Sequence, residues 1–206
     1  MDFPASRQAV AGNAFDKYGS SDPVVRRVMS GFFRALDRCW HRAGPAAAVL
    51  DVGCGEGWIT RAWARRLPDA RVVGVDREDP ELRRHWNATS EPNVTLQVVD
   101  AHSLPYGDDA FDLVCAIELL EQADDPAQVL RELTRCARRG VIVSVPREPL
   151  WRALNLASGR YVRALGNSPG TRNHWSASAF EGLVAEHAAI ERVETPLPWT
   201  MILARP

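Results

Sequence analysis

Short apolar runs alternate along the chain with stretches in which apolar residues recur at helical spacing. The runs are continuous in Val, Ile and Leu, a pattern typical of strands that are buried on both faces. Strands are expected at residues 46–52, 70–76, 93–100, 111–118 and 139–146, and helices at 58–67, 80–87 and 126–137. Strand and helix in regular succession predict a parallel sheet with right-handed crossovers.

Two regions lie outside this rhythm. Residues 22–44 carry an apolar stripe at helical spacing, with a capping Asp22-Pro23 pair at the start and Gly44-Pro45 at the end, which predicts an amphipathic helix. Residues 147–175 interrupt the pattern further on, and apolar positions from Leu150 to Leu165 within them predict one helix. A helix over 176–188 and two last strands joined around two prolines follow.

Composition and charge narrow the class of protein. The chain has 206 residues, which suits one domain, and a formal net charge of −1, so no field of one sign draws nucleic acid or a membrane surface to it. The first residues lack a secretory signal and no apolar run is long enough to span a bilayer. The four cysteines are scattered, which predicts reduced thiols, a cytoplasmic protein and no metal site.

Three glycines lie between the strand expected at 46–52 and the helix expected at 58–67, in the stretch LDVGCGEG. Gly53, Gly55 and Gly57 let the backbone turn sharply and let a ligand approach the main chain. Ligands of open α/β sheets bind at the carboxyl ends of the strands, and the next helix offers free N–H groups there. A tight turn without a ligand is the alternative interpretation.

Acidic residues end three consecutive strands, at Asp51, Asp76 and Asp100. Asp76 lies nineteen residues after Gly57, and an acid at about that distance binds ribose hydroxyls in nucleotide sites. Asp100 taken alone fits a turn cap equally well. Together the three carboxylates are expected on one edge of the sheet.

The motifs LDVGCGEG, VVGVD, VVDAHSLPYGDDAFDLVCAIELLEQADDP and RGVIVSVP occur in this order between residues 46 and 146. This order resembles the class I S-adenosylmethionine-dependent methyltransferases, small-molecule type, with the ubiquinone/menaquinone-biosynthesis-like enzymes (methyltransferase type 11) as the nearest subgroup. The resemblance implies one Rossmann-like α/β domain over residues 1–206, with a seven-stranded, mostly parallel sheet, helices on both faces and an antiparallel last strand. It also implies a helical lid at 1–44 and an acceptor-side insertion at 147–175.

The resemblance assigns cofactor-binding roles to residues at the strand ends. Residues expected to surround the methionine part of the cofactor are Asp51, Gly53, Cys54 and Gly55, and the ribose is expected at Asp76 beside Arg77. The adenine is expected at Asp100, Ala101 and His102, with Ile117 and Glu118 under the cofactor. The lid over the cofactor is expected to include Phe15, Asp16 and Tyr18. Trp58 is a candidate wall of the cofactor site. One position departs from the family pattern, because Gln122 stands where related sequences often carry histidine.

Two other functions remain open on the residues alone. A nicotinamide-dependent Rossmann oxidoreductase needs a third glycine one position later, where this chain has Trp58, and no Tyr-x-x-x-Lys motif is evident. A protein that binds S-adenosylmethionine without catalysis is the second alternative.

The insertion at 147–175 holds five arginines against one acid, Glu148. Arg147 and Arg172 are candidates to receive an anionic acceptor, with a solvated helix face as the alternative. Trp151, together with Trp175 and Trp199, is a candidate to line an aromatic acceptor pocket, with ordinary core packing as the alternative.

His174 is the candidate general base, because a histidine can accept a proton at neutral pH. Its alternative role is to lock the start of the following helix together with its two neighbours. The expected reaction is in-line methyl transfer to a small molecule that is anionic or aromatic, at oxygen by family habit, with nitrogen, carbon and protein acceptors still open. Nucleic acid is disfavoured because no Asn-Pro-Pro-Tyr-type motif follows the fourth strand.

Overall fold

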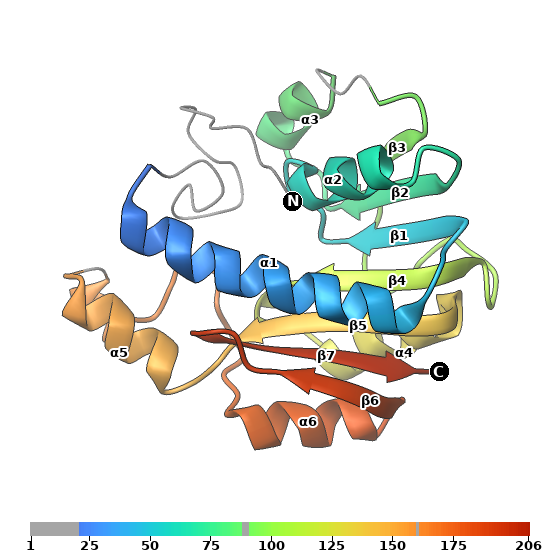
Figure 1. Cartoon of the computed structure of the whole chain (residues 1–206). Helices are drawn as coiled ribbons and strands as arrows, with labels where there is room; N and C mark the ends of the chain where they lie inside the picture. The colour runs from blue at the N-terminus through green and yellow to red at the C-terminus, as the bar shows by residue number, and fades with distance from the viewer. Residues whose placement is uncertain (1–20, 88–90, 160) are drawn as a thin grey trace.

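A computed structural model describes residues 21–87, 91–159 and 161–206 (Figure 1). Its centre is a seven-stranded sheet in the order β3-β2-β1-β4-β5-β7-β6. The strands are β1 (Ala48–Val52), β2 (Arg71–Asp76), β3 (Val94–Val98), β4 (Phe111–Ile117), β5 (Ala137–Pro146), β6 (Ala189–Glu194) and β7 (Trp199–Arg205). The first five strands pair in parallel, and β7 runs antiparallel to both β5 and β6. The expected Rossmann-like sheet with an antiparallel last strand is confirmed.

Helices cover both faces of this sheet. They are α1 (Pro23–Ala43), α2 (Trp58–Arg66), α3 (Pro80–Asn87), α4 (Pro126–Cys136), α5 (Leu150–Ala157) and α6 (Ala177–Ala185), with short 3-10 turns η1 (Leu120–Gln122) and η2 (Val162–Ala164). Side chains of neighbouring strand positions alternate between two cores: Leu50 and Val114 pack with α4 and α6, and Val49 and Leu113 pack with α1 and α2. The continuous apolar runs of β1, β2, β4 and β5 therefore reflect strands buried on both faces. The same expectation is wrong for β3, which has no buried residue because it lies at the edge of the sheet.

The first described helix, α1, packs along the sheet. The Asp22 carboxylate accepts hydrogen bonds from the backbone N–H groups of Val24 and Val25, at 2.7 and 3.3 Å, which caps its start. Its buried stripe contacts β5 and β7 in the α1–α2 core. This part of the expected lid therefore covers a face of the sheet, and Phe15, Asp16 and Tyr18 lie outside the described residues.

The insertion after β5 differs from its prediction. The expected single helix up to Leu165 ends at Ala157, and the chain then turns into η2. Gly159 and Tyr161 adopt left-handed backbone angles, with φ of 70° and 50°, which no α-helix contains. Apolar spacing alone predicted one helix here because the side chains on both sides of the break keep the same period.

Candidate functional site

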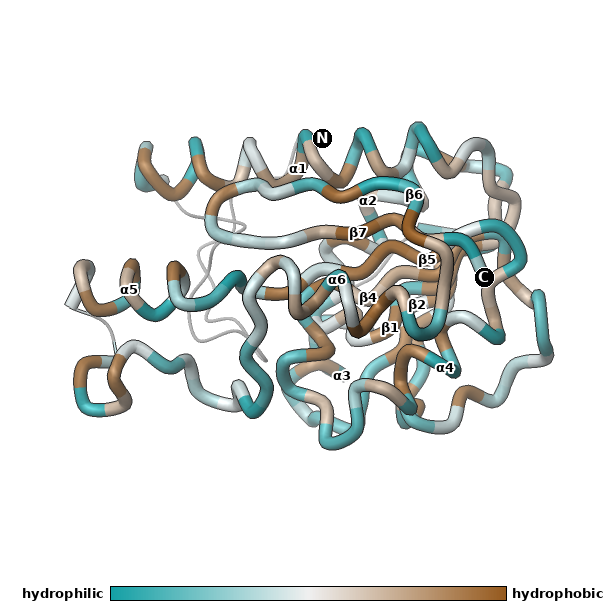
Figure 2. The backbone as a smooth tube through the Cα atoms, turned by 90° about the horizontal axis from the view of Figure 1, so that it is seen from below, coloured by the Kyte–Doolittle hydropathy of each residue, from teal (hydrophilic) through white to brown (hydrophobic). Residues whose placement is uncertain are grey.

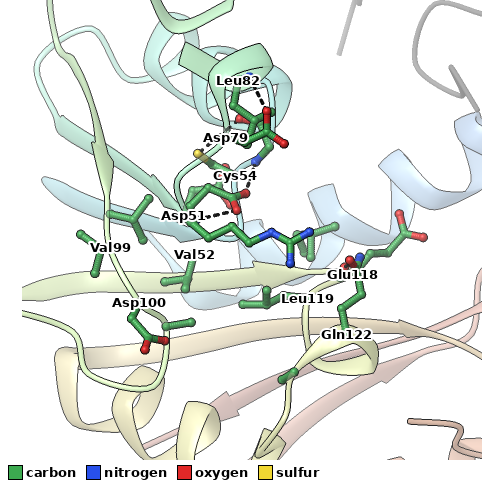
Figure 3. A pocket seen from close by; sticks show the side chains of 18 of the residues that line it. Asp51, Val52, Cys54, Asp79, Leu82, Val99, Asp100, Glu118, Leu119 and Gln122 are labelled. Carbon is green, nitrogen blue, oxygen red and sulfur yellow. Dashed lines mark hydrogen bonds between the residues drawn. The ribbon is translucent and has the colours of Figure 1, made fainter. Parts of the chain in front are cut away.

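A cavity of about 530 Å³ opens at the carboxyl ends of β1, β2 and β4 (Figure 3). It lies where the strand order turns from β1 back to β4, the position at which open α/β sheets bind ligands. Every described residue that the sequence assigned to the cofactor lines it, namely Asp51, Gly53, Cys54, Gly55, Asp76, Arg77, Asp100, Ala101, His102, Ile117 and Glu118, and so does Trp58. The structure thus brings together residues that are spread over 68 positions of the sequence, from 51 to 118.

The glycine loop shapes one wall of the cavity. The backbone N–H groups of Gly53 and Cys54 both donate to the carbonyl oxygen of Val75, at 2.8 and 3.0 Å, which ties the loop to β2. Gly53 has φ of +74°, and a Cβ there would lie 2.9 Å from Cδ1 of Leu119. Gly55 also lines the cavity, with φ of +54°, but a Cβ there would meet no atom within 4 Å. The loop therefore presents bare backbone to open space, as a close-fitting ligand requires.

Asp76 stands at the end of β2 with its carboxylate fixed in place. Oδ2 accepts a hydrogen bond from the Gly55 N–H at 2.7 Å, and Oδ1 accepts one from the Arg77 N–H at 2.8 Å. Burial raises the pKa of this carboxyl group, and the two backbone hydrogen bonds oppose the rise. The carboxylate is therefore both oriented and partly withdrawn from water.

Asp51 lies deeper, at the floor of the cavity. Its Oδ2 accepts a hydrogen bond of 2.5 Å from the Thr60 hydroxyl group on α2. Burial raises the pKa of Asp51 to about 7, the Thr60 hydrogen bond works against this rise, and the nearby Asp76 adds to it. A positive charge in the cavity would favour the ionised form of this carboxyl group.

Asp100 and His102 form a pair beyond β3. The His102 backbone N–H donates to Asp100 Oδ1 at 2.9 Å, and Nδ1 of the ring lies 2.8 Å from the same oxygen. These two hydrogen bonds lower the pKa of Asp100. Because the Asp125 N–H donates to Nε2 of the ring, at 3.3 Å, the ring proton of neutral His102 belongs on Nδ1, facing Asp100.

Glu118 and Gln122 lie at the other end of the cavity (Figure 3). Glu118 has φ of 56°, an uncommon conformation for a residue other than glycine. Its N–H donates to the Ser144 carbonyl oxygen at 2.9 Å, and its Oε1 accepts a 2.8 Å hydrogen bond from Nε1 of Trp199. Nε2 of Gln122 donates to the Glu118 carbonyl oxygen at 3.2 Å. The residue that departs from the family pattern therefore faces the cavity itself.

The four residues assigned to the acceptor do not line this cavity. The Arg172 guanidinium pairs with Asp124, which does line it. The Trp151 ring lies beside the Trp199 ring, with 5.8 Å between their centroids, and Trp199 in turn is hydrogen-bonded to the cavity residue Glu118. Arg147 is held through its backbone N–H, which donates to the Pro198 carbonyl oxygen at 2.9 Å.

His174 and Trp175 lie elsewhere. Nε2 of His174 is 2.9 Å from Oδ1 of Asn167, within the insertion. The Trp175 ring packs against Phe180 of α6, at 5.7 Å between centroids, on the α4–α6 side of the sheet. The three tryptophans proposed for one aromatic pocket are therefore divided, because Trp199 belongs to the opposite core.

Sequence reasoning missed two contacts that shape the site. Thr60 sits in the first turn of α2 and reaches back to Asp51. Nε1 of Trp86, on α3, donates to the Gly55 carbonyl oxygen at 2.8 Å and supports the glycine loop from outside. The sequence holds a weak indication of the Thr60 contact, namely a hydroxyl residue in the first turn of the helix that follows the glycines. It holds no indication of the Trp86 contact.

The charge of the cavity is strongly one-sided. Its described lining holds eight carboxylates and one guanidinium, that of Arg77. Such a lining suits a cationic ligand and disfavours the negative pyrophosphate of a dinucleotide. Among residues 21–87, 91–159 and 161–206, no group of three or more His, Cys, Asp or Glu side chains could hold a metal ion. Over the same ranges, no helix has the length and apolarity to cross a membrane.

Comparison with known proteins identifies the family. A model of the methyltransferase domain matches residues 50–145. The demethylmenaquinone methyltransferase of Roseiflexus castenholzii is 31% identical over 193 residues, covering 85% of this chain and 80% of that protein. The malonyl-[acyl-carrier protein] O-methyltransferase of Halorhodospira halophila is 38% identical over 104 residues, covering 48% of this chain and 35% of that protein.

A solved structure agrees with these relatives at the level of the fold. Magnesium protoporphyrin IX methyltransferase from Synechocystis PCC 6803, with bound S-adenosylhomocysteine, superposes with a TM-score of 0.62 at 19% identity, covering 91% of this chain and 90% of that one. The region that the family model matches, residues 50–145, includes the glycine loop together with Asp51, Asp76 and Asp100. The chain therefore belongs to the class I methyltransferases and is an enzyme that uses S-adenosylmethionine as its methyl donor.

Proposed function

We propose that this enzyme methylates an oxygen atom of a small molecule by in-line displacement. The observation that carries the proposal is the single cavity that runs from the glycine loop and Asp76 to Glu118 and Gln122. One end suits the cofactor, and the other end lies where an acceptor would approach it. Alignment of two bound reactants supplies about 7–11 kcal/mol of a barrier, so such a cavity accounts for much of catalysis.

The cofactor end fits S-adenosylmethionine, which supplies an electrophilic methyl group on a sulfonium ion. The Asp76 carboxylate, fixed by two backbone N–H groups, would accept hydrogen bonds from both ribose hydroxyls. The bare backbone of Gly53 and Gly55 and the ionised form of Asp51 would hold the cationic methionine part. Asp100, oriented by His102, would accept the adenine amino group.

The acceptor end offers a carboxylate held in a defined orientation. Trp199 fixes one oxygen of Glu118, and a carboxylate has lone pairs for more than one donor. A hydroxyl group of the acceptor would donate to Glu118, which would orient its oxygen and draw its proton during transfer. The name of the Halorhodospira relative, an O-methyltransferase, supports oxygen as the acceptor atom.

The acceptor itself is proposed to be anionic or aromatic. Arg172 stands at the rim through its pair with Asp124, and Trp151 stands behind Trp199. Both side chains would meet an acceptor larger than the cavity, and Arg147 is placed in the same insertion. The base role that the sequence assigned to His174 has no support from the geometry, because the ring lies outside the cavity lining.

Calorimetric titration with S-adenosylhomocysteine tests the cofactor end. The native enzyme and an Asp69→Ala variant should bind alike, since Asp69 is exposed at the opposite edge of the sheet. An Asp76→Ala variant should lose about tenfold or more in affinity, the value of a charge-assisted hydrogen bond. Equal binding by all three proteins would exclude Asp76 as the ribose ligand.

A further inference from the structure

The insertion after β5 folds into a closed unit, here called the α5–η2 hairpin and defined as residues 150–159 and 161–168. Nε1 of Trp151 donates to Oγ of Ser168 at 2.9 Å, and Nδ2 of Asn155 donates to the Gly166 carbonyl oxygen at 2.8 Å. Gly166 lies so close to Arg152 that a Cβ would overlap the Arg152 carbonyl oxygen. These contacts hold the two arms of the hairpin together through polar groups and the backbone.

The α5–η2 hairpin buries a polar side chain and exposes aliphatic ones, the reverse of an ordinary surface helix. Asn155 is the buried residue of α5, at 7% exposure. The aliphatic side chains point outward instead: Leu154 and Leu156 are each 40% exposed, Val162 57% and Leu165 72%. Figure 2 shows hydrophobic segments on α5 and on the turn beside it, away from the sheet. Apolar side chains gathered on one projecting unit mark an interaction site.

Arginines accompany this apolar surface. Residues 147–175 hold five arginines and one acid, a local charge of +4, so the rest of the chain sums to −5 against the total of −1. Arg152 and Arg163 are exposed on the hairpin itself, and Arg152 lies 3.6 Å from Glu148. The near-zero net charge, which suggested no membrane contact, hides this separation of a basic insertion from an acidic remainder.

Exposed aliphatic side chains with two exposed arginines on the same hairpin match the interface of an anionic bilayer. The aliphatic groups enter the boundary between headgroups and acyl chains, and the guanidinium groups meet the lipid phosphates. A protein partner would more often be met by exposed aromatic residues, and the strongly exposed large side chains here are Leu and Val. The chemistry therefore favours a lipid surface.

The base of the hairpin adjoins the mouth of the catalytic cavity. Trp151 contacts Trp199, which is hydrogen-bonded to the cavity residue Glu118. On the other side, a Cβ at Gly170 would lie 3.5 Å from Oε1 of Gln122. In Figure 1, α5 projects from the edge of the sheet at which the parallel strands end. A surface bound by the hairpin would thus lie beside the acceptor end of the cavity.

From these observations we infer that the α5–η2 hairpin docks the enzyme peripherally on an anionic membrane surface. Leu154, Leu156, Val162 and Leu165 form the inserted apolar group, and Arg152 and Arg163 contact lipid phosphates. Docking does not depend on the proposed choice of an oxygen acceptor, and it is measured without turnover.

Flotation with lipid vesicles tests this inference on the full chain. The enzyme should float with vesicles of phosphatidylcholine mixed with phosphatidylglycerol, bind much less to phosphatidylcholine alone, and dissociate as salt screens the arginines. An Arg152→Gln/Arg163→Gln variant should lose about 25-fold in vesicle affinity, at about fivefold for each arginine. A Leu154→Ser/Leu165→Ser variant should lose about tenfold or more.

Matched controls separate docking from folding. Val193→Ser removes an exposed aliphatic group from β6 and should bind vesicles like the native enzyme. All variants should bind S-adenosylhomocysteine as the native enzyme does, which shows that they fold. Vesicle binding that is unchanged in both hairpin variants would overturn the inference. So would a dimer in size-exclusion chromatography that the leucine variant converts to monomer, since the surface would then join two copies of this chain.

Discussion

Replacement of Asp51 by asparagine should stabilise the enzyme in a pH-dependent way. The buried Asp51 carboxyl has a pKa of about 7 in place of 3.8, mainly because burial disfavours its charge. In the folded state the group therefore keeps its proton over a range in which the unfolded chain has lost it. The Asp51 carboxyl group therefore contributes fully to the free energy of unfolding below pH 3.8, and this contribution is lost as the pH rises toward 7.

The size of this effect follows from the shift. A change of about three pKa units at 1.36 kcal/mol each corresponds to a loss of about 4 kcal/mol once both states are ionised. An asparagine has nearly the same shape, and its amide oxygen can still accept the hydrogen bond from Thr60. The variant should thus match the native enzyme in acid and exceed it by several kcal/mol above pH 7.

Urea unfolding at a series of pH values measures this difference directly. The difference between the two free energies of unfolding removes the contributions of titrating groups that do not interact with Asp51. S-adenosylmethionine binding should weaken about tenfold or more in the variant, because the proposed role of Asp51 is that of a charged partner of the cationic methionine part. A stability difference that does not vary with pH would refute the argument that burial perturbs this carboxyl group.

Three further substitutions test separate parts of the site. Gly53→Ala should destabilise the fold by about 1–3 kcal/mol in urea unfolding, because φ of +74° and the approach to Leu119 both oppose a Cβ; Gly107→Ala, with open space around it, is the control. Arg172→Ala should raise the acceptor KM and leave S-adenosylhomocysteine affinity unchanged, measured by product release with a panel of hydroxylated carboxylic and aromatic acceptors; an unchanged KM would remove this arginine from acceptor binding. The base role of His174 requires that His174→Ala lose turnover with a changed pH profile, and near-full turnover over the pH series would reject it.

The central part of the fold could be predicted from the sequence because it is encoded locally. Continuous apolar runs fix the buried strands, and Gly53 to Gly57 fix the turn at which the cavity forms. Since parallel strands end at one edge of the sheet, their order in the sequence is enough to place Asp51, Asp76 and Asp100 together.

The acceptor side could not be predicted in this way. The break after Ala157 depends on Gly159 and Tyr161 taking left-handed angles, which the apolar period does not encode. The bond from Trp199 to Glu118 joins positions 81 residues apart, so no local pattern signals it. His174 occupies a polar loop, and no local pattern indicates the direction in which its ring points.

The position of β7 determines the order in which this enzyme can be completed during synthesis. β6 pairs with β7 and with no other strand of the described chain, although it is made first. A ribosome must therefore deliver residues 199–205 before β6 can join the sheet and before Trp199 can fix Glu118. Nascent chains that stop short of β7 should carry the glycine loop and the acidic strand ends but lack the hydrogen bond from Trp199 to Glu118, so this wall of the cavity is ordered only after β7 has been made.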